Sequence, residues 1–258
     1  AARAALGAPA AATAAELDCL LAPRRVIDVS FPTSGIVAEV AVERGSTVRA
    51  GSVLARLDTR LEQATIRIAE TRLAESATLD AARTQLDLVD RQLGRTRELA
   101  QRQVATEARV EQIEAERQGV LRTVREQEEL KRVQALELDR ARTVLELRGL
   151  RSPLDGVVVE RLIHPGEYVD TRKALVVAEL DPLAVEVIAP AALFGRFVAG
   201  EEMTVRLLPP QAGETRARVD IVAAYVDAAS GTFRVRLSLP NPNRRLIAGF
   251  GCRLTVAE

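Results

Sequence analysis

A short sequence pattern occurs twice in this chain, and Gly156 of the second copy stands 121 residues after Gly35 of the first. In each copy a glycine opens a run rich in Val and Ile, a second glycine follows, and an apolar stretch closes the unit. Matching glycines make coincidence in a Val- and Gly-rich chain the weaker explanation. The identical positions are Pro32, Gly35, Val37, Glu39, Gly45, Val48 and Leu54, which recur as Pro153, Gly156, Val158, Glu160, Gly166, Val169 and Leu175.

Each copy of the repeat predicts three short β-strands separated by two turns. A three-strand unit of this size buries little apolar surface alone, so we expect residues 26–58 and 148–181 to pair into one small β-sandwich. The segment between the copies must then leave and return at nearby points. The expected turn glycines are Gly35, Gly45, Gly156 and Gly166.

The inserted segment, residues 59–147, has the composition of long helices. It contains no proline and only two glycines, Gly94 and Gly119, while Leu, Ala, Glu, Gln and Arg dominate. If the chain reverses near residues 101–105, two arms of about 40 residues match in length, and each spans on the order of 60 Å. We therefore expect an antiparallel helical hairpin.

Apolar residues of the first arm follow alternating spacings of three and four, which is the pattern of a coiled-coil seam. They are Leu79, Ala82, Leu86, Val89, Leu93, Thr96 and Ala100. The second arm is less regular, because Arg117, Gln127, Lys131 and Gln134 interrupt the stripe that Val110, Ile113, Val120, Val124, Leu138, Ala141 and Leu145 share. Without the flanking repeat, a solvated spacer or a dimerisation arm would be the preferred interpretation.

Residues 182–258 predict an all-β region. Thr232–Leu239 alternates as a half-buried strand, Pro240 and Pro242 end that strand, and Gly249 permits a turn before the last one. The chain as a whole is therefore of the α+β multidomain class.

The composition argues against several classes of function. The 36 basic and 36 acidic side chains balance to a net charge of +0, which gives no electrostatic reason to expect nucleic acid or an anionic membrane as the main partner. One His, one Met and no Trp leave few groups for metal binding or acid–base catalysis. We therefore predict a protein that has no enzymatic activity, no cofactor and no metal site.

The two cysteines leave two interpretations open. Cys19 and Cys252 are too far apart for a CxxC motif, and with one imidazole they do not complete a structural zinc site. They form one disulfide or they are two unrelated buried thiols, because the sequence alone does not place their Cα atoms within bridging distance.

No segment has the pattern of a membrane-crossing helix, since Glu179, Asp181 and Glu186 interrupt the most apolar region, residues 174–192. The Ala-rich start, residues 1–15, lacks a charged region followed by a continuous apolar core. We interpret it as a flexible end of the mature chain rather than as a signal peptide.

The order of these parts resembles the periplasmic adaptor, or membrane fusion protein, family (HlyD/AcrA-like) of tripartite efflux pumps and type I secretion systems. In that family a helical hairpin splits two lipoyl-like half-motifs, and a small β-barrel follows. The resemblance implies half-motifs at 26–58 and 148–181, a coiled-coil hairpin at 59–147, a barrel at 182–258, and a tail with a possible barrel strand at 1–25. It rests on SGIVAEVAVERGSTVRAGSVLARLD, SPLDGVVVERLIHPGEYVDTRKALVVAEL and VDAASGTFRVRLSLPNPNRRLIAGF, and it covers about residues 26–256.

Family members that dock on TolC-type channels carry the pattern R-x3-L-x6-S at the hairpin tip. Arg95, Leu99 and Thr106 stand at these spacings, with Thr in place of Ser, and Gln103 lies in the same tip. Arg95 and Leu99 lie one helical turn apart on one face, and Thr106 can cap the returning helix. The resemblance therefore implies a channel-docking tip, and the alternative is an ordinary helix end with an N-cap threonine.

The resemblance also implies a location and partners. We expect a periplasmic protein, held at the inner membrane by a segment outside the given chain, that joins an RND or ABC transporter to an outer-membrane channel as a hexamer. An oxidising periplasm would favour the disulfide. Many members have a membrane-proximal domain built from both chain ends, for which too few residues precede the first repeat, so this domain is either missing or truncated.

Two rival interpretations remain to be weighed. A lipoyl or biotin carrier needs a lysine in the turn that the helical insertion occupies, whereas Lys131 lies in the helix and Lys173 in a later loop. The likeness to a carrier is therefore one of fold. A structural coiled-coil protein of the cell envelope explains the hairpin but not the split repeat, and it is the alternative that we keep.

Overall fold

The computed structural model describes residues 15–256, so the flexible end predicted for residues 1–15 lies outside the described residues except for Ala15, which begins the first strand. The elements are β1 (Ala15–Ser30), β2 (Gly35–Val40), β3 (Thr47–Val48), β4 (Val53–Leu57), α1 (Arg60–Ala74), α2 (Ala77–Gln101), α3 (Glu107–Glu146), β5 (Gly149–Arg151), β6 (Gly156–Arg161), β7 (Tyr168–Val169), β8 (Lys173–Pro190), the 3₁₀ helix η1 (Ala191–Leu193), β9 (Glu202–Leu207), β10 (Gly213–Val222), β11 (Thr232–Leu239) and β12 (Gly251–Val256). The chain divides into two compact units, one of Ala1–Phe31, Glu39–Ala55 and Leu150–Glu258, the other of Pro32–Ala38 and Arg56–Gly149.

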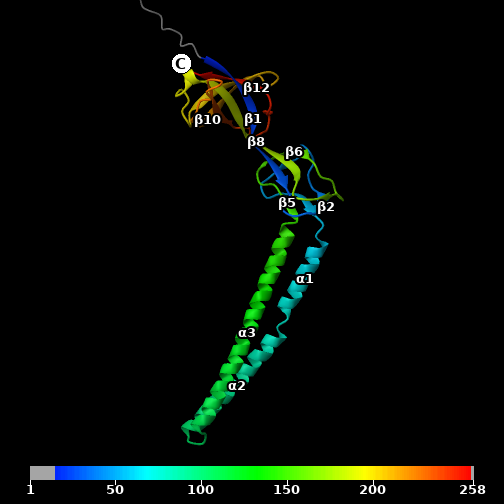
Figure 1. The fold of residues 1–258 in the computed structure, drawn as a ribbon, viewed down its shortest axis with the longest axis vertical. Coiled ribbons are helices and arrows are strands. Elements are labelled where there is room, and N and C mark those ends of the chain that lie inside the picture. The colour runs from blue at the N-terminus through cyan, green and yellow to red at the C-terminus, as the bar shows by residue number, and fades with distance from the viewer. Residues whose placement is uncertain (1–14, 257–258) are drawn as a thin grey trace, which may run out of the picture. The chain divides into compact units, whose positions relative to one another are not determined.

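The larger sheet closes into a barrel (Figure 1). Its strands follow the order β1-β12-β9-β10-β11-β8-β6-β3, and an additional pairing of β1 with β8 joins the ends of the first six strands. Inward-facing side chains form one buried cluster, to which β9 contributes Met203 and β12 contributes Leu254. β11 alternates buried and more exposed positions over the predicted range, and Gly249 has the positive φ, 97°, of the predicted turn. A second sheet has the order β5-β4-β2-β7.

Asn241 organises the loop between β11 and β12, and the sequence analysis did not single it out. Its backbone N–H donates to Asp181 Oδ1 (2.8 Å), and its buried side-chain amide donates to the carbonyl oxygens of Leu180 and Leu246. Its Oδ1 accepts the N–H of Leu246 (3.1 Å). The asparagine at the start of the segment NPN is therefore explained by the structure, because a buried amide is stable only when its donors and acceptor are satisfied.

The two copies of the repeat contain the same turn. Gly45 and Gly166 have φ values of 90° and 85°, which favour glycine. In the first copy the N–H of Glu43 donates to Ser46 Oγ (2.9 Å), and in the second the N–H of His164 donates to Glu167 Oε2 (3.0 Å). Equivalent positions thus make one hydrogen bond with different side chains, so the repeat is closer in structure than its identities suggest.

Gly35 and Gly156 are not turn residues, contrary to the sequence-based expectation. They begin β2 and β6, and neither has a positive φ. A Cβ atom on Gly156 would lie 2.4 Å from the carbonyl oxygen of Ala178, and one on Gly35 would lie 2.8 Å from a guanidinium nitrogen of Arg148. Gly156 requires glycine because the backbone of another strand packs closely against it, whereas at Gly35 a Cβ atom would have to displace the end of the Arg148 side chain.

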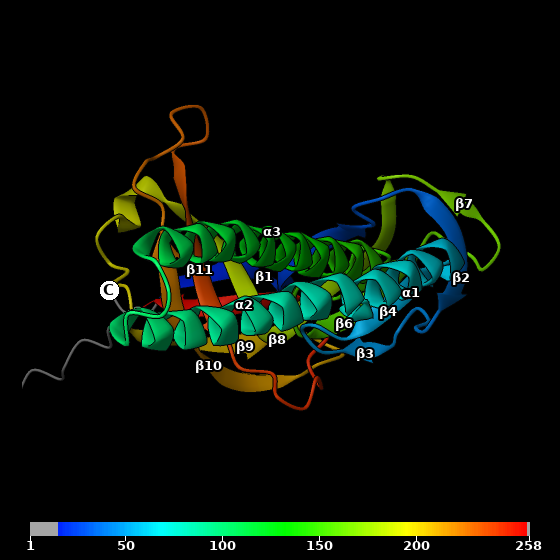
Figure 2. The same ribbon diagram turned by 90° about the horizontal axis from the view of Figure 1, so that it is seen from below.

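The inserted segment forms three helices rather than two continuous arms (Figures 1 and 2). α3 is one helix of 40 residues, whereas Glu75 and Ser76 divide the first arm into α1 with 15 residues and α2 with 25. The chain reverses between Gln101 and Glu107, where the reversal was predicted. Over the described part of the chain, no helix combines the length and the apolar character that crossing a membrane demands.

The predicted apolar stripes of α2 and α3 pack against each other. Val89, Leu93 and Ile113 form a buried cluster, with Val110 and Val120 packed on it. Burial of each such side chain stabilises the pairing by roughly 1.5–3 kcal/mol. Ion pairs join the arms in antiparallel register, namely Arg97 with Glu114, Arg117 with Asp90, Arg83 with Glu128 and Arg142 with Glu70.

The break in the first arm stands opposite the polar part of α3. In the antiparallel register, half-buried Lys131 and Gln134 take the seam positions that face it. The two arms bury little apolar surface against each other there. Packing between them therefore does not hold the first arm in one continuous helix. Ser76 precedes α2 and its hydroxyl donates to the carboxylate of Asp80 (2.6 Å), an acid in the first turn.

Candidate docking interface

The hairpin tip is a Schellman motif at the end of α2. The N–H of Val104 donates to the carbonyl oxygen of Leu99 and the N–H of Gln103 to that of Ala100, both at 2.9 Å. Gln103 has φ 61°, the left-handed conformation that glycine usually takes at this position. The backbone alone therefore reverses the chain, and the side chains of the tip are left for other contacts.

The tip exposes apolar side chains next to a positive charge. Leu99 is 43% exposed and Val104 is 73% exposed. Arg95 is exposed one turn before Leu99 on α2. Within residues 15–256, Arg95 has no ion pair, so its guanidinium is available to a partner. Val104 was missed by the sequence analysis, because no glycine marks the position of Gln103 as the left-handed residue that precedes it.

Thr106 lies where the sequence predicted it but does not act as predicted. It is the N-cap residue of α3, with φ −83° and ψ 150°, yet its hydroxyl makes no capping hydrogen bond. The backbone carbonyl oxygen of Thr106 instead accepts the N–H of Arg109 (3.0 Å). The hydroxyl is exposed beside the turn, so Arg95, Leu99, Gln103 and Thr106 are brought together at one end of the hairpin.

The base of the hairpin contains a buried ion pair that the sequence analysis also missed. Glu62, 6% exposed, faces α3 from the first turn of α1, and Arg148 Nε donates to its Oε1 (2.8 Å). Arg148 Nη1 donates to the carbonyl oxygen of Ser34 (2.7 Å), and the carbonyl oxygen of Arg148 accepts the N–H of Leu57 (2.9 Å). One arginine thus connects both arms to the strand segments on either side.

Other ion pairs shift pKa values outside the tip. A side-chain hydrogen bond from Arg60 lowers the pKa of Asp58, which precedes α1, and a hydrogen bond to Asp28 raises the pKa of Lys173 in β8. In both cases the cause is a hydrogen bond with an exposed side chain of the chain itself. Across residues 15–256, no three His, Cys, Asp or Glu side chains gather in a way that could hold a metal ion.

Cys19 and Cys252 are joined by a disulfide in the structure. They are direct cross-strand partners in the antiparallel pair of β1 and β12, and their Cα atoms lie 4.8 Å apart, within the usual range for a disulfide. The bond connects residues 233 positions apart in the sequence. Mass measurement after alkylation, with and without prior reduction, tests the bond, and equal masses would exclude it.

The chain matches family models over most of its length. Residues 25–179 match the model described as a CzcB-like, barrel-sandwich hybrid domain, and residues 183–258 match a CusB-like, beta-barrel domain. A barrel-sandwich domain, a helical hairpin and a β-barrel together define the architecture of a membrane fusion protein. The chain belongs to the membrane fusion protein family, whose members are non-enzymatic adaptors.

Solved structures of this family have the same fold. MacA from Actinobacillus actinomycetemcomitans has a TM-score of 0.77 at 20% identity, over 95% of this chain and 78% of MacA. The membrane fusion protein Spr0693 from Streptococcus pneumoniae has a TM-score of 0.60 at 15% identity, over 95% of this chain and 99% of the other. ZneB from Cupriavidus metallidurans has a TM-score of 0.52 at 21% identity, over 95% and 71%.

A curated relative from Haemophilus influenzae, described as an uncharacterized protein, is 22% identical over 241 residues. The alignment covers 92% of this chain and 56% of the relative. The chain thus spans little more than half the length of the curated protein that it matches.

Proposed function

We propose that the chain is a periplasmic adaptor subunit that joins an inner-membrane transporter, of the RND or ABC type, to a TolC-type outer-membrane channel for efflux or secretion. The observation that carries this proposal is the hairpin tip, where Arg95, Leu99 and Thr106 are exposed beside a turn made by backbone hydrogen bonds alone. The work of such a subunit is binding and spacing, which requires reach and exposed contact groups but no covalent chemistry.

The proposal includes a finer account of the fold. The sandwich is a lipoyl-like domain split into residues 26–58 and 148–181, and the equivalent turns at Gly45 and Gly166 support this division. The insertion at 59–147 is an antiparallel coiled coil, which the packed stripes of α2 and α3 support. Residues 182–258 form the barrel.

Assembly follows from the weakness of a single tip. The Arg95 side chain and two exposed apolar side chains give a small contact, so several copies must act together. Six copies, with their hairpins side by side around one axis, would present six tips to the channel at once. The transporter supplies the energy, and no nucleic acid is a partner.

Site-specific photo-crosslinking in intact envelopes tests the proposal. A photoreactive residue in place of Leu99 or Thr106 is expected to capture an outer-membrane channel, identified by mass spectrometry. The matched control is Leu88, which is 50% exposed on α2 and lies away from the tip. The control position should capture no channel.

A different pattern of capture would favour the alternative, a structural coiled-coil protein of the envelope. A photoreactive residue in place of Tyr225, an exposed position in a barrel loop, tests separately whether the chain contacts a transporter. If Leu99 and Thr106 capture only a second copy of this chain and Tyr225 captures no transporter, the adaptor proposal is wrong.

A further inference from the structure

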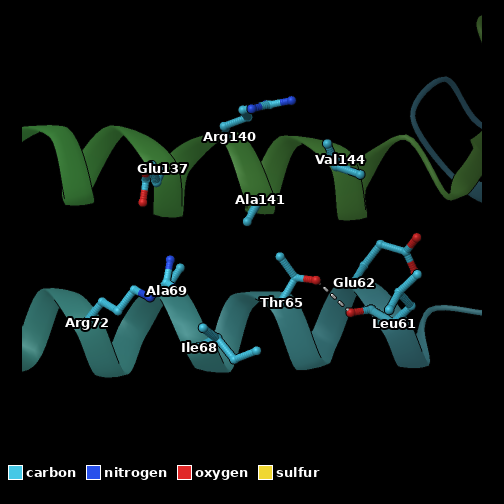
Figure 3. A pocket seen from close by; sticks show the side chains of 10 residues that line it. All are labelled: Leu61, Glu62, Thr65, Ile68, Ala69, Arg72, Glu137, Arg140, Ala141 and Val144. Atoms are coloured by element: carbon cyan, nitrogen blue, oxygen red, sulfur yellow. Dashed lines mark hydrogen bonds between the residues drawn. The ribbon is translucent and has the colours of Figure 1, made fainter.

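A groove of about 470 Å³ runs between α1 and α3 near the base of the hairpin (Figure 3). Ala69 and Ala141 point from the two helices toward each other, and these small side chains leave the space between the helices open. Leu61 and Ile68 of α1 and Val144 of α3 line the groove. Its size lies in the range of sites that hold drug-sized molecules.

The apolar lining of the groove is accessible on α1. Leu61 is 75% exposed and Ile68 is 54% exposed, although Ala69, next to Ile68, is buried in the seam. The exposed pair lies two turns apart along one side of α1 and forms a strip that also includes Thr65. An apolar molecule lying along this strip would remove both side chains from water, which is favourable.

Glu62 supplies the polar end of the groove. Its carboxylate is buried and lines the groove, and Arg148 occupies its Oε1. Its second oxygen, Oε2, is also buried and has no hydrogen-bond partner among the described residues. A buried acceptor without a donor is unfavourable, so this oxygen favours a ligand that brings an N–H or O–H group.

The other charged side chains that line the groove are two arginines and one glutamate, and none of them stands beside the Glu62 carboxylate. Figure 3 shows Glu137 projecting from α3 toward α1, whereas Arg140 projects away from α1. Arg72 stands beside Ala69 on α1, at the end of the groove opposite Glu62. Glu137 thus lies with Arg72 at the far end of the groove, and a ligand at the Glu62 end meets the Glu62 carboxylate, which Arg148 also contacts.

We propose that this groove binds an amphiphilic amine. Its ammonium group donates to Glu62 Oε2, and its apolar chain lies over Ala69 and Ala141 against Leu61, Ile68 and Val144. The binding is argued from the groove alone. That the bound amine is also exported rests on the proposed adaptor function. Failure of channel capture by Leu99 would overturn the adaptor function and leave the amine site to be decided by its own test.

Isothermal titration calorimetry with two amphiphiles of equal chain length tests the site on the whole chain. Decylammonium and decanoate, both below their micelle concentrations, carry the same apolar tail and opposite charges. Decylammonium is expected to bind about tenfold more tightly, because only the ammonium makes a charge-assisted hydrogen bond with Glu62. Equal affinities would show that the carboxylate takes no part and would overturn the proposal.

Two variants with matched controls place the binding in the groove. Ala141→Leu fills the space and should weaken decylammonium binding at least about tenfold, whereas Ala135→Leu adds the same side chain to an exposed position of α3 and should change it less than about twofold. Glu62→Gln should remove the preference for decylammonium, whereas Glu70→Gln, which removes a charge from an exposed ion pair of α1, should keep it. Should Glu62→Gln fail to fold, Ala141→Leu still decides.

The remaining outcomes separate the sources of an amine and the other occupants. Soluble decylammonium binding without flotation on phosphatidylethanolamine vesicles assigns a free amphiphile, and flotation lost in Ala141→Leu assigns a lipid headgroup, so either result supports an amine site. Amine binding that Ala141→Leu leaves unchanged would overturn the groove. An absence of amine binding, with self-association in sedimentation velocity that Ala141→Leu abolishes, would make the groove an interface between copies.

Discussion

The two ends of the helical hairpin use their side chains in opposite ways. At the base, Arg148 donates to Glu62 and to the carbonyl oxygen of Ser34, so its charged side chain makes its hydrogen bonds within the chain. At the tip, backbone hydrogen bonds make the turn, and Leu99 and Val104 remain exposed. A base that holds its geometry and a tip that offers contacts are what a long connecting arm needs.

The difference predicts that stability and binding respond to different substitutions. Changes at the base should lower the free energy of unfolding, whereas changes at the tip should leave it nearly constant and act on partner capture. Two results would contradict this difference: a substitution at the base that leaves the free energy of unfolding unchanged, or a substitution at the tip that unfolds the hairpin.

The largest effect is expected for Arg148→Met. This change leaves Glu62 buried without its cation, which should lower the free energy of unfolding by roughly 3 kcal/mol. Urea denaturation followed by the helical circular dichroism signal measures it. The matched control is Arg142→Met, which removes the cation of the exposed pair with Glu70 and should cost less than about 1 kcal/mol. Equal costs for the two variants would mean that the base has no special role.

Gly35→Ala should come next. The new Cβ would lie 2.8 Å from a guanidinium nitrogen of Arg148, whose side chain is held by two partners and has little freedom to move. We expect a loss of about 1–2 kcal/mol. A double-mutant cycle sharpens the assignment, because in the Arg148→Met background the same change should cost much less. Additive costs would show that Gly35 matters for another reason.

The parts of the molecule that the sequence predicted are those that depend on local patterns. Periodic patterns predicted the helical arms and the strand over Thr232–Leu239, because each depends on local repetition along the chain. The reversal was predicted from the equal lengths of the two arms. The roles of Gly35 and Gly156 were predicted wrongly. A glycine needed for close approach looks the same in sequence as one needed for a turn, and the approaching segment lies far away in the chain.

The candidate site was predicted in its position but not in its chemistry. The family pattern that Arg95, Leu99 and Thr106 resemble implied that all three lie at the tip, yet the hydroxyl of Thr106 makes no cap. Exposed Val104 depends on Gln103 taking a left-handed conformation, for which the sequence offers no glycine as a signal. The Glu62–Arg148 pair joins residues 86 positions apart, beyond what periodicity within one helix detects.

Gln103→Gly should have a small stabilising effect. A residue with a Cβ atom at φ 61° is strained, and glycine relieves this strain but adds freedom to the unfolded chain. We expect a net gain of about 0.5 kcal/mol in the free energy of unfolding, with channel capture by a photoreactive residue at Leu99 unchanged. A clear loss of stability would indicate that the Gln103 side chain holds the turn together, which would make the tip more like the base.

The smallest effect on stability is expected for Leu99→Asp. The side chain is already 43% exposed, so its replacement should change the free energy of unfolding by less than about 0.5 kcal/mol. The matched control is Leu88→Asp, which makes the same change at a similarly exposed position of α2. Urea denaturation should give similar values for the two variants.

The same pair of variants separates the tip from the rest of the arm by function. With a photoreactive residue at Thr106, Leu99→Asp should reduce channel capture about tenfold, because a carboxylate replaces the apolar contact and would lose its water on docking. Leu88→Asp should capture the channel like the parent chain. If both variants lose capture equally, the contact runs along the arm and is not confined to the tip. If neither does, Leu99 is only the partner of Val104 within the turn, and the tip would then resemble the base in using its side chains for its own fold.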